Sequence, residues 1–486
     1  MSMTSDDRSE LPVRTDMLIG GCEVRGEGEW ISVVNPATEA TIAKLKAASV
    51  AQVDEAVRSA QAAFAEASWS DAVFRRKILL KFADLLEENR DALMELLIAE
   101  VGTPVSLKAN HIDTPIMFLR WFAEAAVRDR TRQLGFNPTF SAVSSVVYRP
   151  VGVVAAITAF NYPILIGVTK IAAALAAGCT AVLLTSPQAP LAVLFMGELV
   201  RRAGFPAGTI NILAGGADVG RALTEHEGIS KVSFTGSVAV GRTVMRQAAT
   251  GLASVVLELG GKSAAVMLPG VDFEKYALSL HMRYARNAGQ GCGSPTRILV
   301  EASRYEEFAE ISRKVYPQIK IGDPRDTTTT LGPVISAPQR ERIEKTVAAA
   351  VAGGATIIAG GGRPNIDKGW YLNPVLVGGV DNKAKIAREE IFGPVSVVLP
   401  YHSVEEAIEI TNDSDLGLKT YLFGERDQCM RLVPALRVGT VQVNGGSPLR
   451  PDAPMTGYKH SGVGSEWGED GLREFLQPQH IDCALG

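Results

Sequence analysis

Cysteine is scarce in this chain, whose 486 residues include five. The five are far apart, their number is odd and no C-x-x-C pair occurs among them; they are Cys22, Cys179, Cys292, Cys429 and Cys483. This pattern excludes a disulfide framework and offers no zinc-binding spacing, so we predict no metal site. Free cysteines fit a reducing compartment best, and we expect a cytoplasmic protein.

The chain also lacks an excess of charge of one sign and any long apolar run. Its net charge is −4, without a run of five or more like charges, which excludes the basic surface of a nucleic-acid-binding protein. The most apolar stretch, residues 151–184, is interrupted by Asn161, Pro163 and Lys170. It therefore indicates buried strands and a helix rather than a membrane span. We expect no nucleic-acid partner and no membrane partner, and no signal peptide is recognisable.

Regular patterns fill most of the chain after the polar residues 1–10, which predict a loose tail. Residues 17–45 alternate as strands do and predict a small N-terminal sheet. Residues 49–102 repeat apolar side chains every three to four positions, which predicts helices. Apolar strands and helical segments then alternate, with strands expected at 151–158, 180–185, 209–213, 231–236 and 255–259. That alternation predicts a parallel sheet covered on both faces, which binds ligands at the carboxyl ends of its strands.

A second α/β stretch follows from about residue 262 to residue 445, with strands expected at 297–302, 331–337, 356–361 and 396–401. Residues 139–149 suggest a β-hairpin arm, and the last fifteen or so residues fit neither block. We predict an α/β fold with three parts: a Rossmann-like parallel-sheet domain for the cofactor (1–128 and 151–258), a second α/β catalytic domain (259–450), and a small β oligomerisation arm with the C-terminal segment (129–150 and 451–486). Such an arm favours a homo-dimer or homo-tetramer.

Cys292 lies between two glycines in the segment NAGQGCGSPTR. A thiolate is a natural nucleophile for a carbonyl carbon, and flanking glycines let a reactant approach the sulfur closely. The alternative is a cysteine that packs as a small apolar side chain. Gly291 and Gly293 would add nothing to that role.

Two polar residues follow strands of the predicted parallel sheet. Glu258 ends an apolar strand just before Gly260 and Gly261, where burial raises a carboxyl pKa toward the range of a general base. Asn161 could donate its amide to a developing oxyanion. The alternatives are a solvated strand-end glutamate and a helix-capping asparagine.

Two further segments suit a nucleotide. FTGSVAVG (234–241) joins a strand to a helix, and the N-terminus of that helix, with Gly236 and Ser237, is an anion site for a pyrophosphate. In EEIFGPV (389–395), Glu390 could hold sugar hydroxyls while Phe392 packs on a flat ring. The alternatives are an ordinary strand-to-helix turn and a polar loop with one core aromatic.

Taken in order, these segments resemble the aldehyde dehydrogenase superfamily, of the hydrolytic NAD(P)-dependent type, across essentially the whole chain. Eight features match in the family's order: AFNYP, Lys170 nine residues after Asn161, GFPAGTINIL, FTGS, LELGGKS, GQGC, EEIFGPV and GYKHSGVG. No single match is decisive, but eight in one order are highly specific.

The resemblance implies oxidation of an aldehyde to a carboxylic acid with NAD or NADP. By resemblance, Cys292 is the nucleophile and Asn161 the oxyanion donor, Glu258 activates the water that hydrolyses the thioester, and Lys170 helps to relay protons. The cofactor residues implied are Ile157, Phe160, Thr185, Gly236, Ser237, Gly260, Glu390 and Phe392.

The chain departs from the family pattern at two places. Thr185, in LLTSPQAP, stands where the family usually has a lysine that grips the adenosine ribose, and no carboxylate remains there to repel a 2′-phosphate. Strict NAD preference is therefore in question. Met455 and Thr456 stand where the family usually has Phe-Gly, and Ser465 stands where it usually has arginine.

The substrate class stays open. The expected walls of the substrate pocket are Tyr162, Ile166, Thr169, Leu449 and Met455. Arg286 stands where semialdehyde dehydrogenases of the superfamily place a carboxylate-binding arginine, but Thr169 replaces the second arginine expected beside Lys170, and Arg450 could substitute for it. An acidic aldehyde and an uncharged one are both compatible with these residues.

Three other functions are alternatives to aldehyde oxidation. A CoA-acylating relative would pass the acyl group to CoA, but Glu258 argues for water. A non-catalytic cofactor-binding or structural relative would not need Cys292, Glu258 and Asn161 together. A cofactor-free cysteine hydrolase would need a partner histidine, and none of the six histidines lies in a motif near Cys292.

Overall fold

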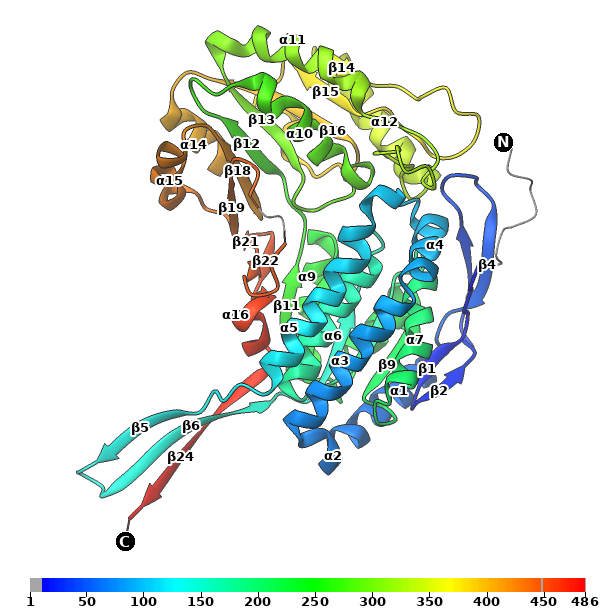
Figure 1. The fold of residues 1–486 in the computed structure, drawn as a ribbon, viewed down its shortest axis with the longest axis vertical. Helices are drawn as coiled ribbons and strands as arrows, with labels where there is room; N and C mark the ends of the chain where they lie inside the picture. Colours follow the sequence, from blue (N-terminus) through cyan, green and yellow to red (C-terminus); the bar gives the residue numbers. More distant parts are fainter. Residues whose placement is uncertain (1–10, 447–448, 486) are drawn as a thin grey trace.

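The computed structural model describes residues 11–446 and 449–485, which form two α/β lobes and a β arm that projects from the lower lobe (Figure 1). The predicted α/β fold class is confirmed. The loose tail predicted for residues 1–10 lies outside the described residues. The domain boundaries stay a prediction.

The lower lobe is built on an eight-stranded sheet of order β2-β1-β9-β8-β7-β10-β11-β22. Its five central strands run parallel, and they are β7 (Val153–Ile157), β8 (Thr180–Thr185), β9 (Ile210–Ala214), β10 (Lys231–Thr235) and β11 (Ser254–Glu258). The antiparallel strands β1 (Met17–Ile19) and β22 (Gly462–Val463) flank them. Strand order reverses between β7 and β10, and parallel sheets bind ligands at such a switch point.

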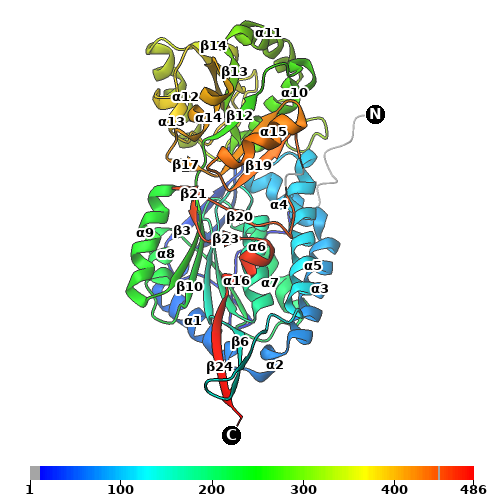
Figure 2. The same ribbon diagram turned by 90° about the vertical axis from the view of Figure 1, so that its left-hand side faces the viewer.

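Helices cover both faces of this sheet (Figure 2). One face carries α6 (Pro163–Ala177) and α7 (Leu191–Ala203), with α3 (Ala72–Glu88), α4 (Arg90–Val101) and α5 (Thr114–Ala126) outside them. The other face carries α1 (Val50–Phe64), α8 (Ala217–Thr224) and α9 (Val238–Ala248). Nearly every residue of α6 is buried because the helix lies between the sheet and α5. An all-round apolar helix is what such a position requires.

The upper lobe contains a seven-stranded sheet of order β14-β15-β16-β13-β12-β18-β19, parallel except for its edge strand β14. Its strands are β12 (Ser263–Met267), β13 (Pro295–Glu301), β14 (Thr356–Gly360), β15 (Val375–Gly378), β16 (Val395–Tyr401), β18 (Lys419–Phe423) and β19 (Thr440–Val443). One face packs on α10 (Phe273–Ala285) and α11 (Tyr305–Val315). The other packs on α12 (Ala337–Ala352), α13 (Lys385–Arg388), α14 (Val404–Asn412) and α15 (Arg426–Leu432).

Two strand predictions need correction. Residues 331–337 do not form a strand: Leu331 makes one isolated bridge to Ile321, residues 332–336 are irregular, and Ala337 begins helix α12. Gly332 packs so closely on Gly102, the residue that caps α4, that an added Cβ would lie 2.2 Å from the Gly102 carbonyl oxygen. The segment is apolar because it is buried, not because it pairs in a sheet. The predicted N-terminal sheet is divided, with β1 and β2 (Cys22–Val24) joined to the large sheet and β3 (Trp30–Val34) paired with β4 (Thr41–Lys46).

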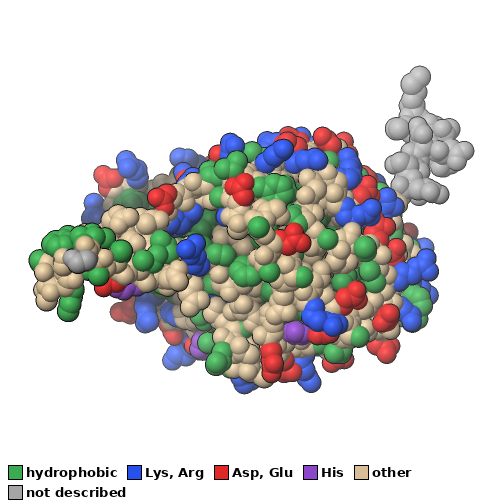
Figure 3. All heavy atoms as spheres, turned by 90° about the horizontal axis from the view of Figure 1, so that it is seen from below, with side chains coloured by type: hydrophobic (Ala, Val, Ile, Leu, Met, Phe, Trp, Pro, Cys, Tyr) green, Lys and Arg blue, Asp and Glu red, His purple; other side chains and the backbone are tan. Residues whose placement is uncertain are grey.

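The projecting arm has three antiparallel strands, β5 (Arg132–Asn137), β6 (Ala142–Pro150) and β24 (Leu476–Ala484). The last residues of the chain, which fit neither predicted domain, thus complete the predicted hairpin. Large apolar side chains are exposed on the arm, among them Leu134, Phe136, Phe140 and Ile481. Figure 3 shows apolar side chains gathered on this projection.

The described residues offer neither a membrane-crossing helix nor a cluster of metal-binding side chains. None of their helices combines the length and apolar character needed to cross a membrane. Nor do they bring together three or more His, Cys, Asp or Glu side chains in a way that could hold a metal ion.

Candidate active site

A pocket of about 1130 Å³ lies between the two lobes. Its lower wall is formed at the carboxyl ends of the five parallel strands of the first sheet. The segment around Cys292, the segment before β16 and the first residues of β18 form its upper wall. Every predicted site residue except Lys170 lines this pocket. The sequence motifs of the two lobes therefore meet at one place.

The backbone before Cys292 is held in an unusual conformation. Asn287, Ala288 and Gly289 have φ values of 52°, 55° and 72°, a left-handed run that is costly for the first two. Contact with the segment before β16 leaves little room, since a Cβ at Gly289 would lie 2.1 Å from the Gly393 backbone. This tight loop positions the cysteine that follows.

Buried amides fasten the Cys292 segment to the lower lobe. The Asn161 amide nitrogen donates to the Gln290 carbonyl at 2.8 Å, and the Asn287 amide donates to the Asn161 carbonyl at 2.9 Å. Gln290 is itself fixed, because its side chain accepts from the Ile335 backbone N–H at 2.9 Å. Asn161 therefore lies beside the residues that precede Cys292, with one N–H of its amide still available.

Cys292 is half-buried and its thiol is not strongly acidic. Burial and the nearby carboxylates of Glu258 and Glu390 raise the pKa of this thiol to about 12. Lys419 opposes that shift, and its side chain lies over Gly293, with Cε 3.5 Å from a Cβ placed there. The cysteine therefore rests as a neutral thiol and must lose its proton during the reaction.

Glu258 has the environment expected of a base. It is 3% exposed, and neither carboxylate oxygen has a hydrogen-bond partner among the described residues. Burial and the charge of Glu466 raise its pKa well above the ordinary range, while Lys170 and Lys419 oppose the shift. The carboxylate can therefore exchange a proton near neutral pH.

The two glycines after Glu258 have steric reasons to be glycine. A Cβ at Gly260 would lie 2.2 Å from a carboxylate oxygen of Glu390, and one at Gly261 would lie 2.2 Å from the Cys292 carbonyl oxygen. Gly260 also lines the pocket, and both glycines let segments of the upper lobe approach Glu258 closely.

Lys170 does not line the pocket but reaches it through Glu466. Its buried ammonium group donates to Glu466 and, at 3.0 Å, to the Ser233 hydroxyl. Ser233 also donates to Glu466 at 3.2 Å. Glu466 lines the pocket, so this polar network connects it with the interior of the lower lobe.

The predicted cofactor residues lie toward one end of the pocket. Ile157 ends β7, Thr185 ends β8, and Gly236 with Ser237 precede α9. Ser237 caps the first turn of α9 by accepting from the Val240 N–H at 3.3 Å. The buried Thr185 hydroxyl donates to the Ala189 carbonyl at 3.2 Å and so stabilises the turn after β8.

Glu390 and Phe392 line this end of the pocket from the upper lobe. A Glu390 oxygen accepts from the Gly261 N–H at 3.1 Å, and burial raises the pKa of this carboxyl to about 7. Phe392 has a φ of 55° and meets the Phe160 ring edge to face at 5.8 Å. The strained backbone at Phe392 holds its aromatic ring against this end of the pocket.

The predicted substrate residues lie at the other end. Tyr162 stacks on His111 at 4.4 Å, and His111 belongs to a π-helical turn, Ala109–Asp113, that also brings Asn110 to the pocket. Ile166, Thr169, Leu449 and Arg286 line the same region. Arg450 lies at the rim, exposed and paired with Asp452 at 2.7 Å.

The departures from the family pattern near the C-terminus are neighbours in space. Strand β20 (Met455–Thr456) pairs with β23 (Ser465–Glu466), so that Thr456 faces Ser465. The Thr456 hydroxyl donates to the Gly464 carbonyl at 2.9 Å. These changes therefore alter one local pairing at the substrate end.

Some pocket residues were not predicted. Lys419 and Tyr421 come from β18, Arg283 from the last turn of α10, and Glu466 from β23. None belongs to a recognisable motif. One available indication is that Lys419 opens an otherwise mostly apolar segment, LKTYLF.

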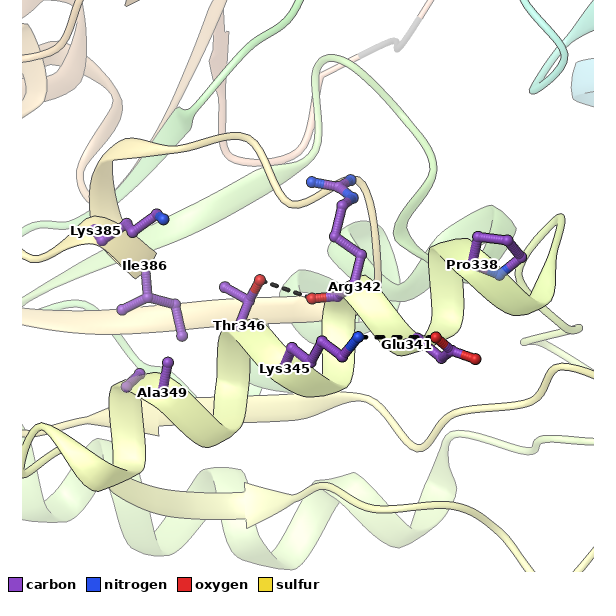
Figure 4. A pocket seen from close by; sticks show the side chains of 9 residues that line it. Pro338, Glu341, Arg342, Lys345, Thr346, Ala349, Lys385 and Ile386 are labelled. Atoms are coloured by element: carbon purple, nitrogen blue, oxygen red, sulfur yellow. Dashed lines mark hydrogen bonds and ion pairs between the residues drawn. The ribbon is translucent and has the colours of Figure 1, made fainter.

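A second hollow, about 570 Å³, lies between α12 and α13 (Figure 4). Arg342, Lys345 and Lys385 line it, with Glu341 as the acidic member. It offers no nucleophile, and Arg342 also lines the main pocket.

Comparison with known proteins confirms the family that the sequence motifs predicted. The model of the aldehyde dehydrogenase family matches residues 24–481. A putative aldehyde dehydrogenase of Staphylococcus epidermidis is 36% identical over 459 residues, which cover 93% of this chain and 95% of the relative. A mitochondrial aldehyde dehydrogenase of Leishmania tarentolae is 36% identical over 476 residues, covering 97% and 95% of the two chains.

Solved structures of similar fold include complexes with NAD⁺. The NAD⁺ complex of aldehyde dehydrogenase from Bacillus cereus has a TM-score of 0.95 and 32% identity, covering 100% of this chain and 99% of the other. Betaine aldehyde dehydrogenase from Staphylococcus aureus, in complex with NAD⁺, has a TM-score of 0.94 and 34% identity, covering 97% and 95%.

Proposed function

The chain belongs to the aldehyde dehydrogenase family, and from that premise we propose that it oxidises an aldehyde to a carboxylic acid with NAD⁺ through a thioester on Cys292. The observation that carries this proposal is the meeting of Cys292, Asn161 and Glu258 at one pocket between the lobes. The three residues come from distant parts of the chain, and each can perform a different step.

The Cys292 sulfur adds to the aldehyde carbon and forms a hemithioacetal, while the thiol proton passes to water in the pocket. Negative charge develops on the aldehyde oxygen during this addition. The free N–H of the Asn161 amide and the backbone N–H of Cys292 are the donors available to it. Asn161 is held by its bond to Gln290 and needs little reorganisation, which is the condition for effective oxyanion stabilisation.

The residues of the pocket fit a nicotinamide dinucleotide. Its volume of about 1130 Å³ slightly exceeds the usual range for a ligand site, about 300–1,000 Å³, which leaves room for a cofactor and a substrate together. The N-terminus of α9 suits the pyrophosphate, Glu390 the ribose hydroxyls, and Phe160 with Phe392 the flat ring. When bound, the nicotinamide supplies the acceptor for the hydride that leaves the substrate carbon.

Glu258 then removes a proton from the water that hydrolyses the thioester. Its carboxylate accepts no hydrogen bond from the described residues, and its raised pKa suits a base that works near neutral pH. The network of Lys170, Ser233 and Glu466 is a route by which protons leave the pocket. A buried base of this kind favours water over CoA as the acyl acceptor.

Formation of reduced cofactor tests the proposal. We expect absorbance at 340 nm to rise when purified protein is mixed with NAD⁺ and an aldehyde from a panel of butanal, benzaldehyde and succinic semialdehyde. The acid product should form in equal amount. Absence of reduced cofactor with every aldehyde, in a protein that binds NAD⁺, would contradict the proposed reaction.

The adenosine end of the pocket should also accept NADP⁺. The carboxylates that line the described pocket, Glu258, Glu390 and Glu466, lie at its catalytic end, whereas Arg221 of α8 lines the other end and has no ion-pair partner among the described residues. We expect Arg221→Ala to lower the ratio of kcat/KM for NADP⁺ to that for NAD⁺ about tenfold, since one charge-assisted bond would be lost. Arg201→Ala, which removes a cation outside the pocket, is the control. An unchanged ratio in Arg221→Ala would show that Arg221 does not read the 2′-phosphate.

We also propose that the arm of β5, β6 and β24 joins copies of this chain into a homo-dimer or homo-tetramer. Its exposed apolar side chains are unfavourable in water and would be buried against a second copy. A cytoplasmic location remains a prediction from the free cysteines.

A further inference from the structure

Three cationic side chains gather on the substrate side of Cys292. Arg283 and Arg286 come from the C-terminal end of α10, and Lys419 is the first residue of β18. All three line the pocket and are half-buried. In the described parts of the chain, none of them forms an ion pair with a carboxylate.

Tyr421 holds this cluster next to the nucleophile. The Arg283 guanidinium carbon lies 5.3 Å from the centre of the Tyr421 ring, and the Lys419 Nζ lies 6.0 Å from it. The Tyr421 hydroxyl donates to the Gly293 carbonyl at 2.8 Å. Arg283 is fixed further by donating to the Gly445 carbonyl at 3.1 Å. The cations are therefore placed by the same residues that position the Cys292 segment.

Such a cluster is costly without a counter-charge. Burial lowers the pKa of Lys419, and Arg283 and Arg286 lower it further, while Cys292 and Glu258 oppose the shift. The positive charges therefore act on one another. Half-buried charges that lack partners are unfavourable. Of the nearby carboxylates, Glu466 binds Lys170 and Asp452 binds Arg450, while Glu258 offsets part of the charge of Lys419. The three cations therefore keep an excess of positive charge. The missing negative charge can be supplied by a ligand.

We propose that the physiological aldehyde carries an anionic group, a carboxylate or a phosphate, that binds between Lys419, Arg283 and Arg286. This inference rests on the proposed function, because it assumes that the aldehyde carbon sits at Cys292. The side chain of Lys419 reaches Gly293, the residue next to that cysteine. The anion is therefore separated from the aldehyde carbon by only a few atoms.

Substrates matched in length test the charge requirement. We expect kcat/KM to be at least tenfold higher for succinic semialdehyde or for glyceraldehyde 3-phosphate than for butanal. The better of the two anionic aldehydes identifies the group as carboxylate or phosphate. If butanal is oxidised with equal kcat/KM, the inference is overturned while the proposed function stands.

Variants test two of the three side chains, Lys419 and Arg283. Lys419→Met and Arg283→Met should each lower the ratio of anionic to neutral kcat/KM at least tenfold, and Lys419→Arg should retain most of it. The matched control is Lys345→Met, which removes an exposed lysine that pairs with Glu341 on α12 (Figure 4). A ratio that falls equally in the control, or in none of the variants, would reject the cluster as the anion site.

A measurement without turnover separates this inference from the proposed function. Succinate and inorganic phosphate are used as probes of the cluster, and alkylation of Cys292 by neutral iodoacetamide is followed by mass spectrometry. We expect one of the two anions to slow alkylation at least threefold in the wild type and not in Lys419→Met. Equal alkylation rates with and without both anions would overturn the anion site even if aldehydes are oxidised.

Discussion

Replacement of Cys292 by alanine should lower kcat for aldehyde oxidation about 10⁶-fold, to the background level, as loss of a covalent nucleophile does in other enzymes. The reason is chemical, because without the sulfur the aldehyde cannot form the hemithioacetal from which the hydride leaves to give the thioester. The absorbance at 340 nm, followed with the best aldehyde of the panel, measures the effect. The Asn161 amide remains in the variant but has no developing charge to stabilise.

A surface cysteine provides the matched control for this variant. Cys22→Ala, at an exposed position of β2, removes a thiol far from the pocket and should leave kcat within twofold of the wild type. Binding of NAD⁺ by Cys292→Ala, measured by calorimetry, shows whether the pocket is intact. If Cys292→Ala still oxidised the aldehyde at more than about 1% of the wild-type rate, the nucleophile would be another residue.

The first sheet was predictable because its central strands are buried on both faces. Thr180–Thr185 is one uninterrupted apolar segment bounded by turn residues, and β8 has those bounds. Helices pack on both sides of it, so no polar position interrupts the pattern. Residues 331–337 show the limit of this reasoning, since they are equally apolar. Their burial comes from packing in the cores of the upper lobe and against the residue that caps α4, and a sequence pattern cannot distinguish that from burial in a sheet.

The site was predictable where its residues belong to motifs. Cys292, Glu258 and Asn161 each follow a strand or a glycine-rich turn, and parallel topology brings such positions to one edge. Lys419 and Arg283 lie within a strand and a helix, where charged residues are usually solvated. They reach the pocket because β18 lies beside β12 and because α10 ends near Cys292. Only tertiary structure reveals that contact.

Replacement of Glu258 by glutamine should separate the two halves of the reaction. Glutamine keeps the size of the side chain but cannot accept a proton from water, so hydrolysis should slow by about 10²–10⁴-fold, the usual effect of losing a general base. Thioester formation does not need this base. Rapid mixing should therefore show a burst of about one reduced cofactor per site, followed by a slow steady state. Mass spectrometry of the stopped reaction should find the acyl group on Cys292.

The pH dependence distinguishes a base from a residue that only shapes the pocket. Burial and Glu466 raise the pKa of Glu258, so the carboxylate forms at higher pH than an ordinary glutamate. Hydrolysis in the wild type should accordingly rise with pH through that raised pKa, and Glu258→Gln should lose this rise. Glu389→Gln, at an exposed carboxylate, should keep the wild-type profile. If Glu258→Gln lost the burst as well as the steady state, Glu258 would act before the thioester forms, and water activation would have to be assigned to another group.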